Sequence, residues 1–84
     1  NTSSSIDHDC FLDSFVNLSP GVNLAGNVKI GKFSKIGIGA SVSHNLKINQ
    51  NVTIGANSFV NKNCKANKNY YGTPIKIYNQ KKNK

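Results

Sequence analysis

The 84-residue sequence lacks arginine, glutamate, methionine and tryptophan, and its three aspartates all precede position 14. Eleven lysines therefore leave a formal net charge of +8. Nucleic-acid-binding chains of such charge usually contain arginine and interleave aromatic side chains with their basic residues, and neither feature is present. The lysines fit a solvated surface, or a general attraction for a phosphate-bearing ligand, and we expect no nucleic-acid partner.

Long apolar runs are also absent from the sequence. No run approaches the roughly 20 residues that a membrane-spanning helix needs. A secretory signal, with a basic start, an apolar middle and a small-residue cleavage site, does not occur either. We therefore expect no membrane partner.

What the sequence does contain is a regular series of apolar residues. One stands at every sixth position: Ile6, Leu12, Leu18, Leu24, Ile30, Ile36, Val42, Ile48, Ile54, Val60 and Ala66. Ten of the 18 isoleucines, leucines and valines share this phase, and chance would produce such a series roughly once in a million sequences of this composition. The residue two positions earlier is small or aliphatic, and the residue one position later is often Gly, Asn, Asp or Ser.

A period of six fits neither an α-helix nor a plain strand. It fits a short strand followed by a bend, with the long aliphatic side chain inward and Gly, Asn, Asp or Ser at the corner. Three hexads then make one triangular coil, and stacked coils make a parallel β-solenoid with Ile, Leu and Val as its core. The sequence therefore predicts an all-β fold.

The two cysteines, Cys10 and Cys64, occupy the small inward position of their hexads and lie three coils apart. At a strand spacing of about 4.8 Å, this places them about 14 Å from each other. A disulfide needs Cα atoms within about 7 Å. We therefore expect two buried free thiols, which suit a reducing, cytoplasmic location.

The hexads resemble those of the hexapeptide-repeat acyltransferases over residues 4–77. The resemblance implies a left-handed parallel β-helix of about three and a half coils over residues 1–69, against the usual right-handed crossover. A closing segment follows at 70–79, and a basic, disordered tail at 80–84. Because the chain starts without methionine and already in phase, we expect the C-terminal part of a longer protein, without its N-terminal sugar-nucleotide domain.

Only His8 and His44 can act as neutral bases near pH 7. His8 comes just after an inward isoleucine, so we expect it on an outward corner, flanked by Asp7 and Asp9. A carboxylate bonded to the imidazole would fix its tautomer and raise its basicity, although an ordinary polar corner residue has the same spacing. His44, roughly 10 Å away by strand spacing, is expected to be a surface residue.

Three segments, in frame with the hexads, resemble one branch of this family. They are Ile6-Asp7-His8-Asp9-Cys10, Pro20-Gly21 and Leu24-Ala25-Gly26-Asn27-Val28-Lys29-Ile30-Gly31. The branch contains the sialic acid O-acetyltransferases and the bacillosamine-pathway N-acetyltransferases. Residues 71–76 are similar to its closing Gly-x-Pro-Ala-Lys segment, with Ile75 in place of Ala. The resemblance implies His8 as general base and Asp9 as its activator.

The same resemblance implies acetyl-CoA contacts at Asn17, Gly26, Ile38 and Ala56. Asn17 replaces a second histidine, so it can donate a hydrogen bond but cannot carry a proton. The implied activity is direct acetyl transfer to an amine or hydroxyl of a sugar or nucleotide-sugar, with Gly26 N–H or Asn17 holding the oxyanion. By resemblance, the site lies between the subunits of a homotrimer. These residues distinguish neither the acceptor sugar nor O- from N-acetylation.

Two alternatives stay open at this point. One is another hexapeptide acetyltransferase, of the serine or antibiotic type, and the other is a catalytically inactive solenoid scaffold, which Asn17 would suit. A hexapeptide carbonic anhydrase needs three histidine ligands for zinc, and the chain has two, so we expect no metal. An ice-binding solenoid would show threonine ladders, whereas the outward columns here mix Lys, Asn and Ser.

Overall fold

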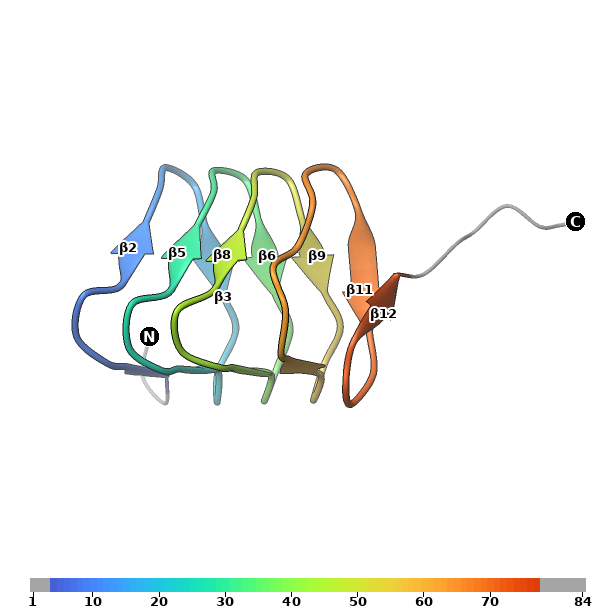
Figure 1. The fold of residues 1–84 in the computed structure, drawn as a ribbon, viewed down its shortest axis with the longest axis horizontal. Helices are drawn as coiled ribbons and strands as arrows, with labels where there is room; N and C mark the ends of the chain where they lie inside the picture. Colours follow the sequence, from blue (N-terminus) through green and yellow to red (C-terminus); the bar gives the residue numbers. More distant parts are fainter. Residues whose placement is uncertain (1–3, 78–84) are drawn as a thin grey trace, which may run out of the picture.

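The computed structural model describes residues 4–77, which form a parallel β-solenoid (Figure 1). Among these residues there is no helix, and hence none that could cross a membrane. The strands are β1 (Ser5–Ile6), β2 (Phe11–Leu12), β3 (Asn17–Leu18), β4 (Asn23–Leu24), β5 (Lys29–Ile30), β6 (Lys35–Ile36), β7 (Ser41–Val42), β8 (Lys47–Ile48), β9 (Thr53–Ile54), β10 (Phe59–Val60), β11 (Asn69–Tyr71) and β12 (Lys76–Ile77).

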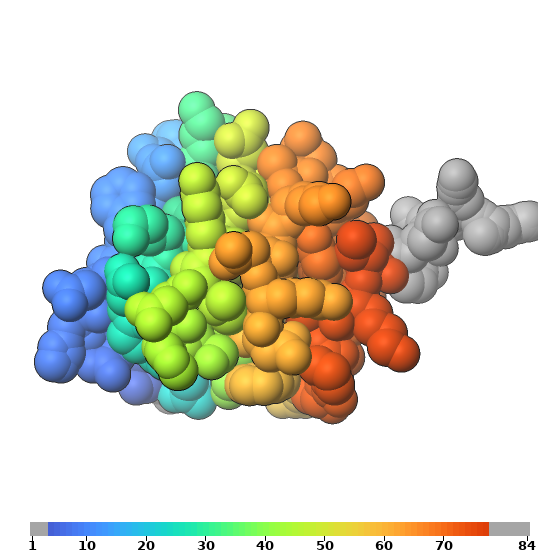
Figure 2. Space-filling view, in the orientation of Figure 1, coloured from blue at the N-terminus to red at the C-terminus, as the bar shows by residue number. Residues whose placement is uncertain are grey.

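Three sheets form the walls of a triangular prism. Wall A contains β1, β4, β7 and β10, wall B contains β2, β5 and β8, and wall C contains β3, β6, β9 and β11, with β12 at its end. Successive turns pair in parallel with an offset of one coil of three hexads, as in Ser5 with Asn23 and Ile6 with Leu24. This confirms the all-β coil. Wall A contains a strand from each of four turns, slightly more than the three and a half coils expected. The turns follow one another along the solenoid as bands of colour in Figure 2.

The predicted inward column forms the core. Ile30, Ile36, Ile48 and Ile54 are at most 1% exposed, and the small inward positions at Val22, Val28, Ala40 and Val52 are fully buried. Burying such an aliphatic side chain contributes about 1.5–3 kcal/mol. The first turn is less protected, because no described residue packs on its outer side and Ile6 is 48% exposed.

The last turn departs from the predicted phase. Cys64, not Ala66, pairs with Ile48 and is fully buried, whereas Ala66 is only half-buried. The turn is two residues shorter than the others, and the side chain of Asn63 compensates by accepting a hydrogen bond from the Lys47 N–H at 2.7 Å. Our placement of Ala66 in the inward column was therefore wrong, because the bend after Val60 lacks two residues.

The corners also differ from the expectation. The residue with left-handed backbone comes three positions after the inward aliphatic, rather than one: Asp9, Phe15, Gly21, Asn27, Phe33, Gly39, Asn45, Asn51, Asn57 and Asn67. Asn, Asp and Gly suit this conformation, whereas a bulky residue is strained by about 1–2 kcal/mol. Phe15 and Phe33 nevertheless adopt it, and their exposed rings stack with centroids 5.3 Å apart.

Glycine at the position directly after the inward residue is explained by packing between turns, not by left-handed backbone. A Cβ on Gly31 would lie 2.5 Å from the backbone nitrogen of Gln50, and one on Gly37 would lie 2.7 Å from that of Ala56. Close approach of neighbouring turns therefore requires glycine at these two positions.

Both cysteines are free, as predicted. Cys64 is buried, and burial raises the pKa of its thiol to about 11, although Lys62 acts in the opposite direction. The expected burial of Cys10 was wrong: it lies in the less protected first turn and is only half-buried, and its thiol donates to the carbonyl oxygen of Ala25 at 3.1 Å.

At its C-terminal end, the described part of the chain folds back against the last turn. β12 runs antiparallel to β11, and Ile75, between them, is buried and donates its N–H to the carbonyl oxygen of Phe59 at 3.0 Å. The predicted basic tail at 80–84, and residues 78–79 of the predicted closing segment, lie outside the described residues.

Candidate functional site

His8 lies on the corner between walls A and B, which we call the A–B corner and define by residues 8–9, 26–27 and 44–45. Asp9 has a φ of 64°, and this left-handed residue closes the bend that follows β1. The carbonyl oxygen of His8 accepts a hydrogen bond from the Asn27 N–H at 3.1 Å, so the bend rests on the same bend of the next turn. Its imidazole is 81% exposed, which confirms the predicted outward position.

The carboxylate in contact with the imidazole belongs to Asp7. Its Oδ1 lies 3.2 Å from Nε2 of His8 and also accepts the His8 backbone N–H at 2.7 Å. One oxygen therefore fixes both the backbone and the ring of the same residue. Asp9, which the family resemblance assigns as activator, makes no hydrogen bond or ion pair with the ring in the described part of the chain. Its role stays a prediction.

Gly26 lies one turn from His8 on the same corner. A Cβ at this position would be 3.7 Å from the His8 carbonyl oxygen and 4.0 Å from Oδ2 of Asp7, which is ordinary van der Waals contact. In contrast to Gly31, packing within the chain therefore does not require glycine here. The Gly26 N–H makes no hydrogen bond within residues 4–77, so it is an available donor one turn from His8.

The other predicted ligand contacts lie elsewhere. Ile38 and Ala56 are exposed on the corner between walls C and A, which we call the C–A corner and define by residues 20–21, 38–39 and 56–57. Asn17 is an exposed residue of β3 on wall C. The structure thus brings His8 and Gly26 together, and it separates both of them from Asn17, Ile38 and Ala56 by the width of a wall.

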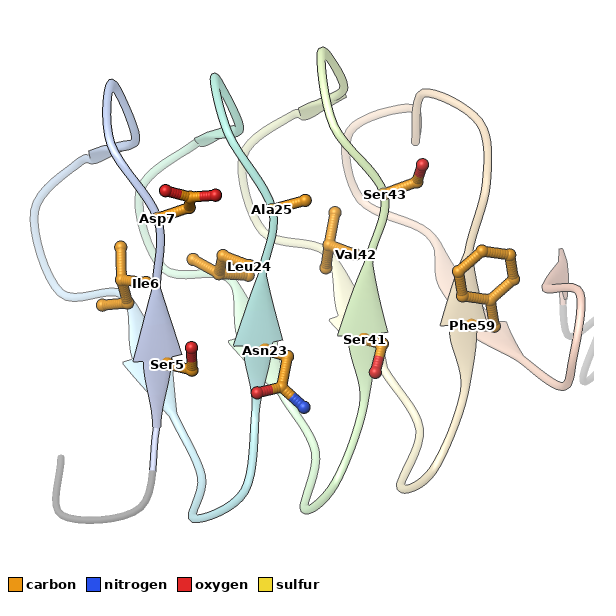
Figure 3. Close-up of a pocket in the computed structure, with 10 residues that line it drawn as sticks. All are labelled: Ser5, Ile6, Asp7, Asn23, Leu24, Ala25, Ser41, Val42, Ser43 and Phe59. Atoms are coloured by element: carbon orange, nitrogen blue, oxygen red, sulfur yellow. The ribbon is translucent and has the colours of Figure 1, made fainter.

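Wall A lies between the two corners and forms a shallow hollow. Figure 3 shows its strands side by side, with two rows of side chains that are mostly small and polar, apart from Ala25 and Phe59. The residues that line the hollow are Ser5, Ile6, Asp7, Asn23, Leu24, Ala25, Ser41, Val42, Ser43 and Phe59. None of them is a lysine, whereas Lys29 and Lys47 lie on wall B and Lys35 on wall C. Wall A is therefore the face on which a copy of this basic chain would meet the least repulsion.

Two features of the corners were not predicted from sequence. The ammonium of Lys29 donates to Oδ1 of Asn27 at 3.1 Å, and Nδ2 of Asn27 donates to Oδ1 of Asn45 at 2.9 Å. The first contact is local, between residues two positions apart, whereas the second joins residues one coil of 18 apart. His44 is exposed, as expected for a surface residue. No cluster of three His, Cys, Asp or Glu able to hold a metal ion occurs in the described ranges.

Proteins of known structure share this fold. A model of the bacterial transferase hexapeptide (six repeats) family matches residues 27–62. The chain is 33% identical to PerB from Caulobacter crescentus in complex with CoA and GDP-perosamine, with a TM-score of 0.92 over 94% of this chain. It is 38% identical to the acetyltransferase domain of PglB from Neisseria gonorrhoeae in complex with acetyl coenzyme A, with a TM-score of 0.91 over 93%.

A serine acetyltransferase also shares the fold, with a lower TM-score. The serine acetyltransferase from Brucella abortus is 26% identical, with a TM-score of 0.73 over 89% of this chain. These findings confirm the left-handed parallel β-helix and the resemblance to the sugar-acetyltransferase branch of the hexapeptide-repeat transferases. The chain spans 38% of the length of the PerB and PglB chains.

Proposed function

We propose that this chain supplies the transfer site of an acetyl-CoA-dependent sugar acetyltransferase, with His8 as general base. The observation that carries the proposal is the A–B corner itself. An exposed imidazole, held by a carboxylate, lies one turn from a glycine that packing within the chain does not require and whose N–H is available. The acceptor is an amine or hydroxyl of a nucleotide-sugar, because the similar proteins include one bound to CoA and GDP-perosamine.

The residues of the corner would divide the reaction between them. His8 takes the proton of the acceptor as its nitrogen or oxygen attacks the thioester carbonyl of acetyl-CoA. Asp7 holds the ring and stabilises the imidazolium that forms. The Gly26 N–H, or the amide of Asn17, donates to the oxyanion of the tetrahedral intermediate. Collapse of the intermediate expels the CoA thiolate, which takes up a proton, so no acyl-enzyme is needed.

The separation of the two residue sets supports a homotrimer. In a ring of three copies with wall A toward the axis, the A–B corner of one chain lies beside the C–A corner of the next. His8 and Gly26 would then face Ile38, Ala56 and Asn17 of the neighbouring chain. The lysines of walls B and C would lie outside the central contact, so the copies could approach without strong repulsion. The trimer therefore completes a site that one chain leaves divided.

The function is tested by an assay of acetyl transfer to GDP-perosamine, with release of the free CoA thiol as the readout. We expect transfer by the wild-type chain, together with its N-terminal part where one exists. General-base catalysis is typically worth 10²- to 10⁴-fold, so His8→Ala should lose about that factor in kcat. A His44→Ala variant, matched in chemistry but two turns away, should retain full activity. A chain that binds acetyl-CoA but loses nothing on His8→Ala would contradict the proposal.

A further inference from the structure

Phe15 and Phe33 occupy a backbone position that phenylalanine does not favour. The other corner residues with left-handed backbone, three positions after an inward residue, are all Asn, Asp or Gly. A bulky side chain is strained in this conformation, and one stacked pair of rings offsets only part of the strain of two residues. Stability of the fold therefore does not account for phenylalanine at these corners, and such an outlier points to a function.

The two rings lie on the outer edge of the solenoid. They belong to the corner between walls B and C, which we call the B–C corner and define by residues 14–15, 32–33 and 50–51. Phe15 is 76% exposed and Phe33 is 52% exposed, and their planes are 3° from parallel. In the trimer proposed above, wall A is toward the axis and this corner is opposite to it, so the rings would stay exposed.

Wall B extends this apolar corner with a third exposed ring and with lysines. Phe11 of β2 is 57% exposed and pairs in register with Lys29 of β5, which pairs with Lys47 of β8. Three of the four phenylalanines of the chain thus lie on this side, and the strands that carry the pairs lie side by side in Figure 1. We call the following six exposed residues the B face: Phe11, Phe15, Lys29, Lys32, Phe33 and Lys47.

The positive charge of the B face is not compensated within the chain. No carboxylate of residues 4–77 forms an ion pair with its three lysines. The acid on this side is Asp13, whose Oδ1 accepts the Ser14 N–H at 2.7 Å. Like charges at Lys29 and Lys47, directly opposite each other in the sheet, are unfavourable until an anionic partner approaches. The B face therefore combines exposed aromatic rings with an excess of positive charge.

We propose that the B face attaches this protein to the surface of an anionic lipid bilayer. The phenylalanine rings would enter the boundary between headgroups and acyl chains, and the lysines would lie at the level of the negatively charged headgroups. A spanning helix needs a long apolar run, which this sequence lacks, but attachment to a lipid surface does not.

Other partners fit the B face less well. A nucleic acid would be expected to meet arginine, which is absent, and open ring faces on which bases can stack, whereas Phe15 and Phe33 cover each other. A second copy of this chain would bring its own lysines against these lysines. A bilayer needs neither arginine nor an open ring face, and it supplies the opposite charge.

The first experiment measures binding of the full-length protein to vesicles by sedimentation. Vesicles of phosphatidylcholine alone are compared with vesicles of equal parts phosphatidylcholine and phosphatidylglycerol, and we expect binding only to the anionic ones. Lys32→Gln should bind them about fivefold more weakly. Lys76→Gln removes the same charge from β12 and should bind like wild type. No binding by wild type, equal binding to both vesicles, or equal weakening in both variants would overturn the proposal.

The second experiment separates the role of the rings in binding from their role in folding. A double variant, Phe15→Asn with Phe33→Asn, places at both corners a residue that suits left-handed backbone. We expect a melting temperature at least as high as that of wild type, with binding to anionic vesicles at least about tenfold weaker. Unchanged vesicle binding would overturn the proposal. If the variant melts lower, Phe11→Ser, which changes no left-handed corner, should still weaken binding, and unchanged binding would overturn the proposal.

Two control measurements address the other partners. A smaller assembly of the double variant in lipid-free solution, by light scattering, would assign the rings to contact between copies and overturn the proposal. Tighter binding to a single-stranded oligonucleotide than to anionic vesicles would assign the B face to nucleic acid and also overturn it. None of these measurements uses a sugar or acetyl-CoA, so their outcome is independent of the proposed function.

Discussion

Asp7 holds His8 at two points with one oxygen, since its Oδ1 lies 3.2 Å from the ring Nε2 and 2.7 Å from the backbone nitrogen. Asp9, on the other side of His8, makes no hydrogen bond or ion pair with the ring in the described part of the chain. Asp9 is committed to the left-handed corner that turns the chain toward wall B. Orientation of the imidazole therefore depends on Asp7.

Replacing this carboxylate should lower the rate of acetyl transfer. Asp7→Asn keeps the size of the side chain but removes the charge that stabilises the imidazolium, and we expect kcat/KM to fall about 10- to 100-fold. Asp9→Asn should cost less, since asparagine suits a left-handed corner. A larger loss for Asp9→Asn, measured in the same assay, would assign the activator to Asp9.

Two glycine substitutions should separate binding from folding. Gly26→Ala places a Cβ 3.7 Å from its nearest atom, so we expect an unchanged melting temperature and a weaker Kd for acetyl-CoA. Gly31→Ala places its Cβ 2.5 Å from the Gln50 nitrogen, and such overpacking typically destabilises by about 1–3 kcal/mol. Thermal unfolding and calorimetry on both variants provide the comparison. A Gly26→Ala chain that binds acetyl-CoA like wild type would remove this residue from the site.

A lysine on wall A should prevent assembly. Ser41 lies on the central strand β7 of that wall, and in the proposed trimer three copies of Ser41→Lys would bring like charges together near the axis. We expect monomers by light scattering and loss of acetyl-CoA binding. Gln50→Lys adds the same charge on the exposed corner between walls B and C, and should stay trimeric. Trimers that tolerate Ser41→Lys would place the interface on another wall.

The two thiols should differ in reactivity. Burial raises the pKa of Cys64 to about 11, so at pH 8 only about one thiol in a thousand is ionised. Iodoacetamide should therefore modify Cys10 first in the native protein and reach Cys64 only after unfolding.

The same raised pKa predicts a pH dependence. The unfolded thiol ionises near pH 9, whereas the folded one resists ionisation until about pH 11, so the contribution of Cys64 to stability is lost as the pH rises through that range.

Peptide mapping after iodoacetamide labelling checks the predicted difference in reactivity between the two thiols. Modification of Cys64 at pH 8 as fast as Cys10 would show that the last turn opens readily.

Much of the fold could be predicted because the hexad directly encodes which side chains are inward. Its phase failed only in the last turn, where Cys64 and Ala66 are both small enough for an inward position and lie two residues apart. Each hexad has two inward positions that are two residues apart, so a deletion of two residues still leaves a small residue at every sixth position of the sequence. Only the strand register shows that the deletion lies in the bend after Val60.

The corners and the site were less predictable. Left-handed backbone at Phe15 and Phe33 contradicts residue preference, because stacking across turns competes with the local strain. Asp7 and Asp9 both flank His8, and side-chain direction alone decides between them. The sequence also did not show how far His8 lies from Ile38. The six-residue spacing assigns each residue to a column of the solenoid, but it does not say whether one ligand can contact both columns.

Subunit mixing tests the central claim most directly. His8→Ala damages the A–B corner, and Ala56→Glu damages the C–A corner, so each homotrimer should be inactive in acetyl transfer. When the two variants are unfolded together in equal amounts and refolded, random trimers should regain about a quarter of wild-type activity, because that share of interfaces pairs two intact corners. A mixture as inactive as its components would contradict a transfer site built between neighbouring chains.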